Sequence, residues 1–195
     1  MGSSDCCPSM KSHSNNRTRR CRPLLGTFVE IDAAGHEEGV ESAVEEAYSV
    51  INHVQRLMSF HDPTSELNRL NLEAHRHAVQ VHPSTWYVLT KACEIAAASG
   101  GAFDPTSTSA LQLQNTQSRK KHAARHCGNW TSIQFLPRSQ IRFNQPLQID
   151  LGGIAKGFAV DLAVETLQRR GIRNGLVNAG GDLRVFGEEL SLIHI

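Results

Sequence analysis

Residues 149–161 have the sequence IDLGGIAKGFAVD, with two adjacent glycines, a lysine and two aspartates where an apolar strand is predicted to lead into a helix. The first turn of a helix leaves backbone N–H groups unpaired and carries a partial positive charge. Glycines let a phosphate approach the backbone, and Lys156 adds a full charge within reach of that turn. This stretch therefore predicts the binding of an anion such as a phosphate.

The spacing excludes the two familiar nucleotide loops. Lys156 precedes the last glycine, whereas the P-loop lysine follows it, and the glycines do not have G-x-G-x-x-G spacing. On composition alone, a tight turn with a solvated lysine explains the stretch equally well. Two further segments, NAGGD at 178–182 and GGAFDPT at 100–106, again pair glycines with an aspartate. Each alone is explained by a bulge or a helix stop, but three such turns in one small domain favour a binding site.

The elements that would position these turns follow from hydrophobic periodicity, in three- and four-residue steps for helices and in alternation for strands. Predicted helices cover residues 39–58, 82–99 and 154–170. A fourth, short helix carries Leu67 and Leu70 and is capped by Ser65 or Thr64. Predicted strands cover 24–32, 79–81, 131–135, 141–143, 147–150, 175–179 and 183–187, while 106–130 is predicted as loop or weak helix. This mixture of strands and helices indicates an α+β fold with a mixed sheet and flanking helices. The alternative is an α/β fold with a mixed sheet, and a regular βαβ repeat is not favoured.

Composition limits the class of protein. The 195 residues are 39% hydrophobic with a net charge of +1, which suits one domain with a core and gives no general case for a nucleic-acid partner. Residues 1–21 are basic and poor in aliphatic side chains, so we expect a disordered tail. Five cysteines without a C-x-x-C pair fit a reducing compartment. We expect no transmembrane segment and no secretory signal, and therefore a cytoplasmic location.

The chain contains five motifs that, in this order, resemble the ApbE family of FAD:protein FMN transferases over about residues 22–187: LLGTFVEI, MSFHDPTSELNRLN, GGAFDPT, IDLGGIAKGFAVD and NAGGDLRVFG. The resemblance implies an enzyme that splits FAD in a reaction that depends on Mg²⁺. Such an enzyme passes the FMN half to a threonine of a target flavoprotein as a phosphoester and releases AMP. The resemblance also implies an alternative location, periplasmic or associated with the inner membrane, as in many relatives.

The resemblance further implies a set of site residues. Positions that match FAD-contacting residues of the family are Leu25, His61, Ala102, Phe103, Asp104, Asp150 and Lys156. Lys156 is expected to stabilise charge during the transfer, and Gly153 is expected to offer Mg²⁺ its backbone carbonyl. Leu25 is explained equally well as a core residue, and His61 as a histidine of a surface turn.

The chain departs from the family pattern at its end. The family carries a later motif in which an aspartate and a threonine complete the magnesium site, whereas residues 191–195 do not continue the pattern and are predicted to be a non-native tail. Residues 22–190 are therefore predicted to be a partial domain, with an unpaired edge at the last strands. Asp161 and Asp182 are interpreted as helix-surface and turn residues and are left out of the site.

Three hypotheses stay open from the sequence. The order of the five motifs favours an FMN transferase. The missing later motif favours, for this polypeptide, a FAD-binding module without transferase activity. A phosphate-binding domain for another nucleotide is the third hypothesis, and the position of Lys156 before the glycine argues against it.

Overall fold

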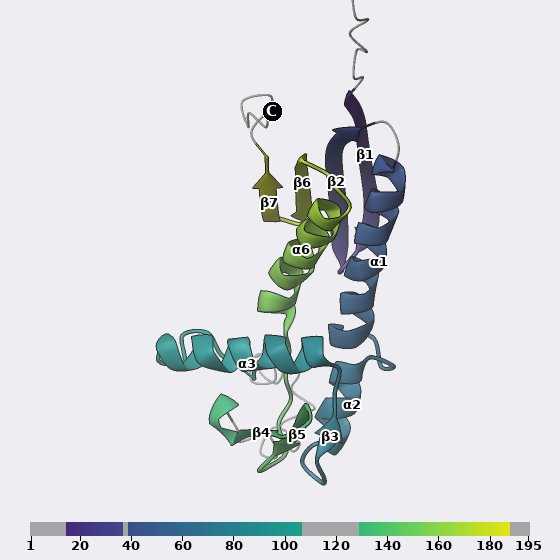
Figure 1. The fold of residues 1–195 in the computed structure, drawn as a ribbon. Coiled ribbons are helices and arrows are strands. Elements are labelled where there is room, and N and C mark those ends of the chain that lie inside the picture. The colour runs from purple at the N-terminus through teal and green to yellow at the C-terminus, as the bar shows by residue number, and fades with distance from the viewer. Residues whose placement is uncertain (1–14, 37–38, 107–128, 188–195) are drawn as a thin grey trace, which may run out of the picture.

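The computed structural model describes residues 15–36, 39–106 and 129–187. In chain order its elements are β1 (Asn15–Leu24), β2 (Thr27–His36), α1 (Val40–Met58), α2 (Glu66–Glu73), β3 (Val79–Gln80), α3 (Pro83–Ala98), the 3-10 helix η2 (Trp130–Ser132), β4 (Ile133–Leu136), β5 (Gln140–Phe143), α6 (Gly152–Arg169), β6 (Asn174–Ala179) and β7 (Asp182–Phe186). They form a larger lobe around a four-stranded sheet and a smaller lobe around a three-stranded sheet (Figure 1). One hydrophobic core runs through both lobes. The helices and sheets confirm the predicted α+β fold, although the described strands form two antiparallel sheets and not one mixed sheet.

The larger lobe has the strand order β1-β2-β6-β7, and all neighbouring strands are antiparallel. Helices α1 and α6 lie side by side against one face of this sheet (Figure 1). Alternate residues of β2, namely Val29, Ile31 and Ala33, are fully buried under these helices. Successive side chains of a strand point to opposite faces, so the alternation in the sequence gives one buried face.

The smaller lobe has β5 between β3 and β4, with α3 lying across the lower end of α6 (Figure 1). Both of its longer helices begin at capping residues, of which the sequence predicts Ser65 and the structure adds His82. Ser65 Oγ accepts a hydrogen bond from the Asn68 N–H at 3.1 Å, and His82 Nδ1 accepts one from the Ser84 N–H at 3.1 Å. These bonds satisfy backbone donors that a helix start otherwise leaves unpaired.

The prediction of a disordered tail over residues 1–21 is wrong for residues 15–21, which belong to β1. Their basic side chains find acidic partners on neighbouring elements. Arg17, for example, donates hydrogen bonds to both carboxylate oxygens of Asp32, at 2.8 and 2.6 Å. The composition of this segment shows its positive charge. It does not show that carboxylates on β2 and α1 lie opposite these side chains.

Two further boundaries differ from prediction. Residues 147–150 are not a strand, because the backbone of Ile149 pairs with the side chain of Asn71 instead of with another strand. Helix α6 begins at Gly152, so the two adjacent glycines form its first turn and are not a loop before it. Predictions for residues 1–14, 107–128 and 188–195 fall outside the described residues. No helix of the described segments is both long and apolar enough to cross a membrane.

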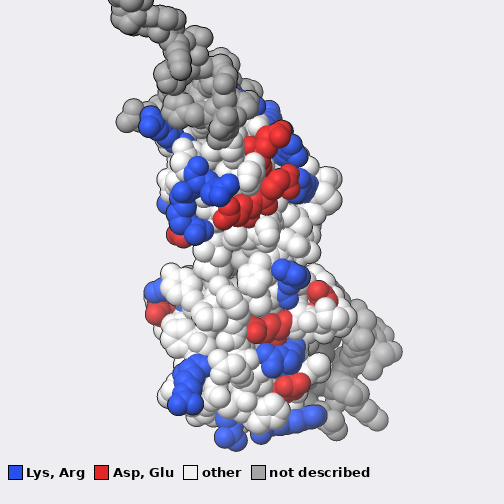
Figure 2. Space-filling model, turned by 45° about the vertical axis from the view of Figure 1, so that its right-hand side comes forward, with Lys and Arg blue, Asp and Glu red and all other residues white. Residues whose placement is uncertain are grey.

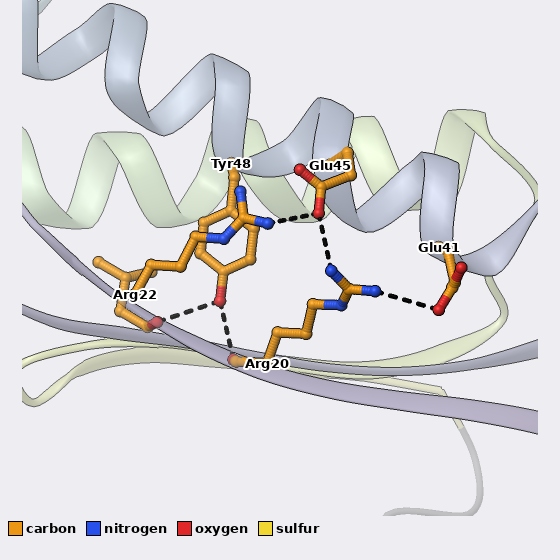
Figure 3. Close-up of polar contacts among 6 residues, drawn as sticks. Arg20, Arg22, Glu41, Glu45 and Tyr48 are labelled. Carbon is orange, nitrogen blue, oxygen red and sulfur yellow. Dashed lines mark hydrogen bonds and ion pairs between the residues drawn. The ribbon is translucent and has the colours of Figure 1, made fainter.

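Charged side chains of opposite sign gather on the outer side of β1 and α1 (Figure 2). Glu45 accepts hydrogen bonds from both Arg20 and Arg22, and Glu41 accepts one from Arg20 at 3.0 Å (Figure 3). The guanidinium of Arg22 also lies over the ring of Tyr48, 4.4 Å from its centre. These contacts attach the edge strand β1 to α1.

We expect Tyr48→Phe to lower the free energy of unfolding by about 1 kcal/mol, because one hydrogen bond between buried groups is lost. The Tyr48 hydroxyl donates to the carbonyl of Arg20 at 2.8 Å and lies 3.2 Å from that of Val29, so it joins α1 to both β1 and β2. Urea unfolding measures the change. Tyr87→Phe is the matched control, since Tyr87 is 49% exposed. Equal stabilities of the two variants would contradict this role.

The same residue predicts a dependence on alkaline pH. Burial raises the pKa of Tyr48 from 10.0 to about 12, so the folded chain favours the neutral phenol. Its contribution to stability is complete below pH 10 and is lost as the pH rises towards 12. Unfolding free energies measured across this interval should fall less steeply for Tyr48→Phe than for the unchanged chain. Parallel profiles would show that another group causes the loss.

Candidate functional site

A cleft of about 580 Å³ opens between the two lobes. Three parts of the chain line it: the turn between β1 and β2, the end of α1 with the loop that follows, and the start of α6. Four residues that the sequence assigns to the site line this cleft together: Leu25, His61, Asp150 and Lys156.

The turn between β1 and β2 presents Leu25 to the cleft. Leu25 and Gly26 form a two-residue turn with φ angles of 56° and 70°, in the left-handed region. This conformation costs a residue with a side chain about 1 kcal/mol. The backbone N–H of Leu25 donates a 2.6 Å hydrogen bond to Gln55 Oε1 of α1, which holds the turn in place. The strained position of Leu25 is therefore fixed by α1.

The loop after α1 carries His61 and is held by one side chain of α2. The carboxamide nitrogen of Asn68 lies within hydrogen-bonding distance of the carbonyls of Asp62 (2.6 Å), Phe60 (2.9 Å) and Ser59 (3.2 Å). The ring of His61 is exposed and packs edge-on against Phe60. The loop thus has a defined path although it contains no regular secondary structure.

Asp62 belongs to the same wall of the cleft. Its carboxylate accepts hydrogen bonds from the Thr64 hydroxyl at 2.7 Å and from the Thr64 N–H at 2.8 Å. These bonds favour the ionised form and hold the pKa of Asp62 below its usual range. The wall that carries His61 therefore also carries a negative charge.

The third wall depends on a pairing between a side chain and the backbone. Asn71 Oδ1 accepts from the N–H of Ile149 at 2.8 Å, and Asn71 Nδ2 donates to its carbonyl at 2.9 Å. The next residue, Asp150, donates its N–H to the Pro105 carbonyl at 2.8 Å. Its carboxylate accepts from the N–H of Gly152 at 2.8 Å and so caps α6 in place of a side chain at the N-cap position.

The start of α6 keeps the features of an anion site. The N–H of Gly153 has no partner among the described residues, and the helix dipole places partial positive charge there. Lys156 lies about one turn further along and lines the cleft. Its ammonium is 3.5 Å from a carboxylate oxygen of Asp182.

Asp182 reaches Lys156 because the turn between β6 and β7 is tight. Gly180 and Gly181 have φ angles of 63° and 104°. A Cβ atom on Gly180 would lie 2.5 Å from Thr27 Oγ1, so the hairpin packs closely against the start of β2. The interpretation of Asp182 as a turn residue alone is therefore incomplete, because the fold places it beside the cleft.

The other predicted site residues do not line the cleft. Ala102, Phe103 and Asp104 lie in the segment that leads to Pro105, next to the start of α6. Phe103 occupies the space beside Gly153, where an added Cβ would lie 3.2 Å from its ring. Asp104 accepts hydrogen bonds from the N–H and the hydroxyl of Thr106, at 2.8 and 2.7 Å.

The structure adds five residues that sequence reasoning leaves out of the site: Gln55, Asp62, Asn68, Asn71 and Asp182. The sequence carries one signal for two of them. Asn68 and Asn71 are three residues apart in SELNRLN, which places their side chains on one side of a helix. Their partners, however, lie in other parts of the chain, and Ile149 is 78 residues from Asn71.

Comparisons with known proteins agree with the fold. An ApbE family model matches residues 25–193. The FAD:protein FMN transferase of Treponema pallidum (strain Nichols) is 26% identical over 188 residues, which covers 86% of this chain and 51% of that protein. The protein of the same name from Chlamydia trachomatis serovar D is 29% identical over 164 residues, with coverages of 79% and 52%. The chain thus spans about half the length of these curated relatives.

Two solved structures have the same fold. The ApbE protein of Thermotoga maritima superposes with a TM-score of 0.78 at 26% identity, covering 89% of this chain and 60% of that chain. The flavin transferase ApbE of Vibrio cholerae gives a TM-score of 0.79 at 24% identity, with the same coverages of 89% and 60%.

We expect Asn71→Ala to lower the free energy of unfolding by about 2–3 kcal/mol, because the N–H and carbonyl of the fully buried Ile149 both lose their partner. Asn71→Asp keeps an acceptor for the N–H but offers the carbonyl no donor, so its loss should be intermediate. Urea unfolding gives the order. Asn52→Ala, at an exposed position of α1, is the control. If Asn71→Ala were as stable as this control, the pairing would not hold the loop.

Proposed function

This chain belongs to the ApbE family, and on that premise we propose that it moves FMN from FAD to a threonine hydroxyl of a target flavoprotein, with release of AMP. The activity is that in the name of its curated relatives, of which it spans about half the length.

The observation that carries the proposal is the convergence of residues in the cleft. Leu25, His61, Asp150 and Lys156 come from distant parts of the sequence, yet they line one space of about 580 Å³. That volume lies in the range of about 300–1,000 Å³ that small-molecule and cofactor sites usually have. In this proposal the diphosphate of FAD lies at the start of α6, and Leu25 offers an apolar surface to the flavin ring.

The proposed reaction is a substitution at phosphorus. The threonine oxygen forms a bond to the phosphorus on the FMN side of the diphosphate, the bond from that phosphorus to the bridging oxygen breaks, and AMP leaves with that oxygen. The hydroxyl proton passes to water. Lys156 and the N–H groups of α6 offset negative charge on the phosphates, which is the main task of a protein in such a transfer.

Mg²⁺ is the cofactor that we propose, since it neutralises phosphate charge when it is bound. It prefers oxygen ligands in octahedral geometry. The described residues include no group of three or more His, Cys, Asp or Glu side chains that could hold a metal ion. They therefore do not fit a complete magnesium site by themselves. We propose the Gly153 carbonyl as one ligand, with others outside the described residues.

The test is mass spectrometry of a peptide with an acceptor threonine after incubation with the chain, FAD and Mg²⁺. We expect a mass gain of one FMN. Lys156→Met should reduce the rate about 100-fold or more, because a charge aimed at the phosphates is lost. Lys91→Met is the matched control. The side chain of Lys91 lies on the exposed side of α3, pairs with Glu94 and does not line the cleft.

The outcomes separate the hypotheses. A peptide with valine in place of threonine should gain no mass. FAD binding without any mass gain would leave the alternative, a FAD-binding module without transferase activity. A chain that does not bind FAD contradicts both.

A further inference from the structure

Two ion pairs join the same two elements, α6 and β7. Lys156 of α6 lies 3.5 Å from Asp182 of β7, and Arg184 of β7 lies 2.8 Å from Asp161 of α6. Only the first pair is at the cleft, because Lys156 lines it and neither Asp161 nor Arg184 does. The two pairs therefore differ in position and in contact length, although they link the same elements.

The ion pair at the cleft is long and exposed, so it can separate easily. A charge-assisted hydrogen bond between an ammonium and a carboxylate is usually about 2.7–2.9 Å long, so a separation of 3.5 Å is a loose contact. The side chains of Lys156 and Asp182 are 35% and 44% exposed, so water and solutes reach both. Such a pair contributes little to stability, and the shorter pair of Arg184 and Asp161 already joins the two elements.

The backbone, in contrast, fixes where Asp182 stands. It follows the two glycines of the β6–β7 turn directly, and Gly180 packs against Thr27. The N–H of Gly181 donates to Asn178 Oδ1 at 3.1 Å, which closes the turn. A carboxylate on a rigid turn thus faces an ammonium on a flexible side chain.

We infer that Asp182 is a positioning residue that acts as an internal counter-ion for Lys156. Without ligand, its carboxylate holds the ammonium at the rim of the cleft. When a diphosphate binds at the start of α6, Lys156 exchanges the carboxylate for a phosphate oxygen. This inference rests on the proposed function, which assigns Lys156 to the diphosphate of FAD.

The exchange has a consequence for specificity. When an anion replaces Asp182 at Lys156, one ion pair forms and a similar one is lost. The anion therefore gains little binding free energy from Lys156. A free phosphate or diphosphate has nothing else to add, whereas a dinucleotide also contacts apolar residues such as Leu25. The ligand class that this arrangement favours is therefore a diphosphate with a large apolar substituent, and small anions bind more weakly.

The experiment measures the affinity for FAD by quenching of flavin fluorescence at low ionic strength. Asp182→Asn frees Lys156, so we expect FAD to bind about two- to fivefold more tightly, as is typical of one exposed ion pair. The affinity for inorganic pyrophosphate, measured by calorimetry, should rise by at least the same factor. Asp161→Asn removes the other pair and is the matched control, for which we expect unchanged affinities.

A double-variant cycle identifies the cause. In a Lys156→Met background, Asp182→Asn should change the affinity much less, because the group that it frees is gone. Weaker or unchanged binding by Asp182→Asn, an equal gain in both backgrounds, or no binding of FAD or pyrophosphate by any variant would overturn the inference. A merely structural role would weaken binding and would not give a gain that depends on Lys156.

The proposed function fails separately from this inference. If the cycle shows the coupling but no FMN reaches the peptide, the transferase proposal is wrong and the counter-ion stands. If FMN is transferred and the coupling is absent, only the counter-ion is wrong.

Discussion

Ile149 has both of its backbone polar groups bound by the side chain of Asn71, and the geometry of the cleft depends on this pairing. Ile149 is fully buried in a segment without regular secondary structure, so its N–H and carbonyl have no strand partner. Buried backbone groups without partners are costly. The carboxamide supplies a donor and an acceptor at once, and this sets the place of Asp150 and hence of the first turn of α6.

The same solution recurs around the cleft. Gln55 holds the backbone of Leu25, and Asn68 holds the carbonyls of the loop that carries His61. All three amide side chains come from α1 or α2, which pack in the core. Leu25 and the loop that carries His61 line the cleft, and the buried Ile149 directly precedes the lining residue Asp150. Rigid helices thus fix loops that would otherwise be free, and a site that is built in this way needs little reorganisation when a ligand binds.

The sequence predicts the helices well, because apolar periodicity and capping residues are local signals. Helix α1 and the Ser65 cap follow from the sequence in this way. The strand β1 does not, since its basic composition suggests a solvated tail until the carboxylates that face Arg17 and Arg20 are known. The pairing of Asn71 is also hidden, because it joins residues far apart in the chain.

For the site, the motifs select a group of residues but do not give their arrangement. They place Leu25, His61, Asp150 and Lys156 in one site, and these residues do line one cleft. They do not separate these four from the triplet 102–104, which lies beside α6 and outside the cleft lining.

The most direct test is a crystal structure of this chain with FAD. We predict the diphosphate at Gly152 and Gly153, with the Lys156 ammonium on a phosphate oxygen and away from Asp182. A diphosphate bound elsewhere, with the pair of Lys156 and Asp182 intact, would contradict it.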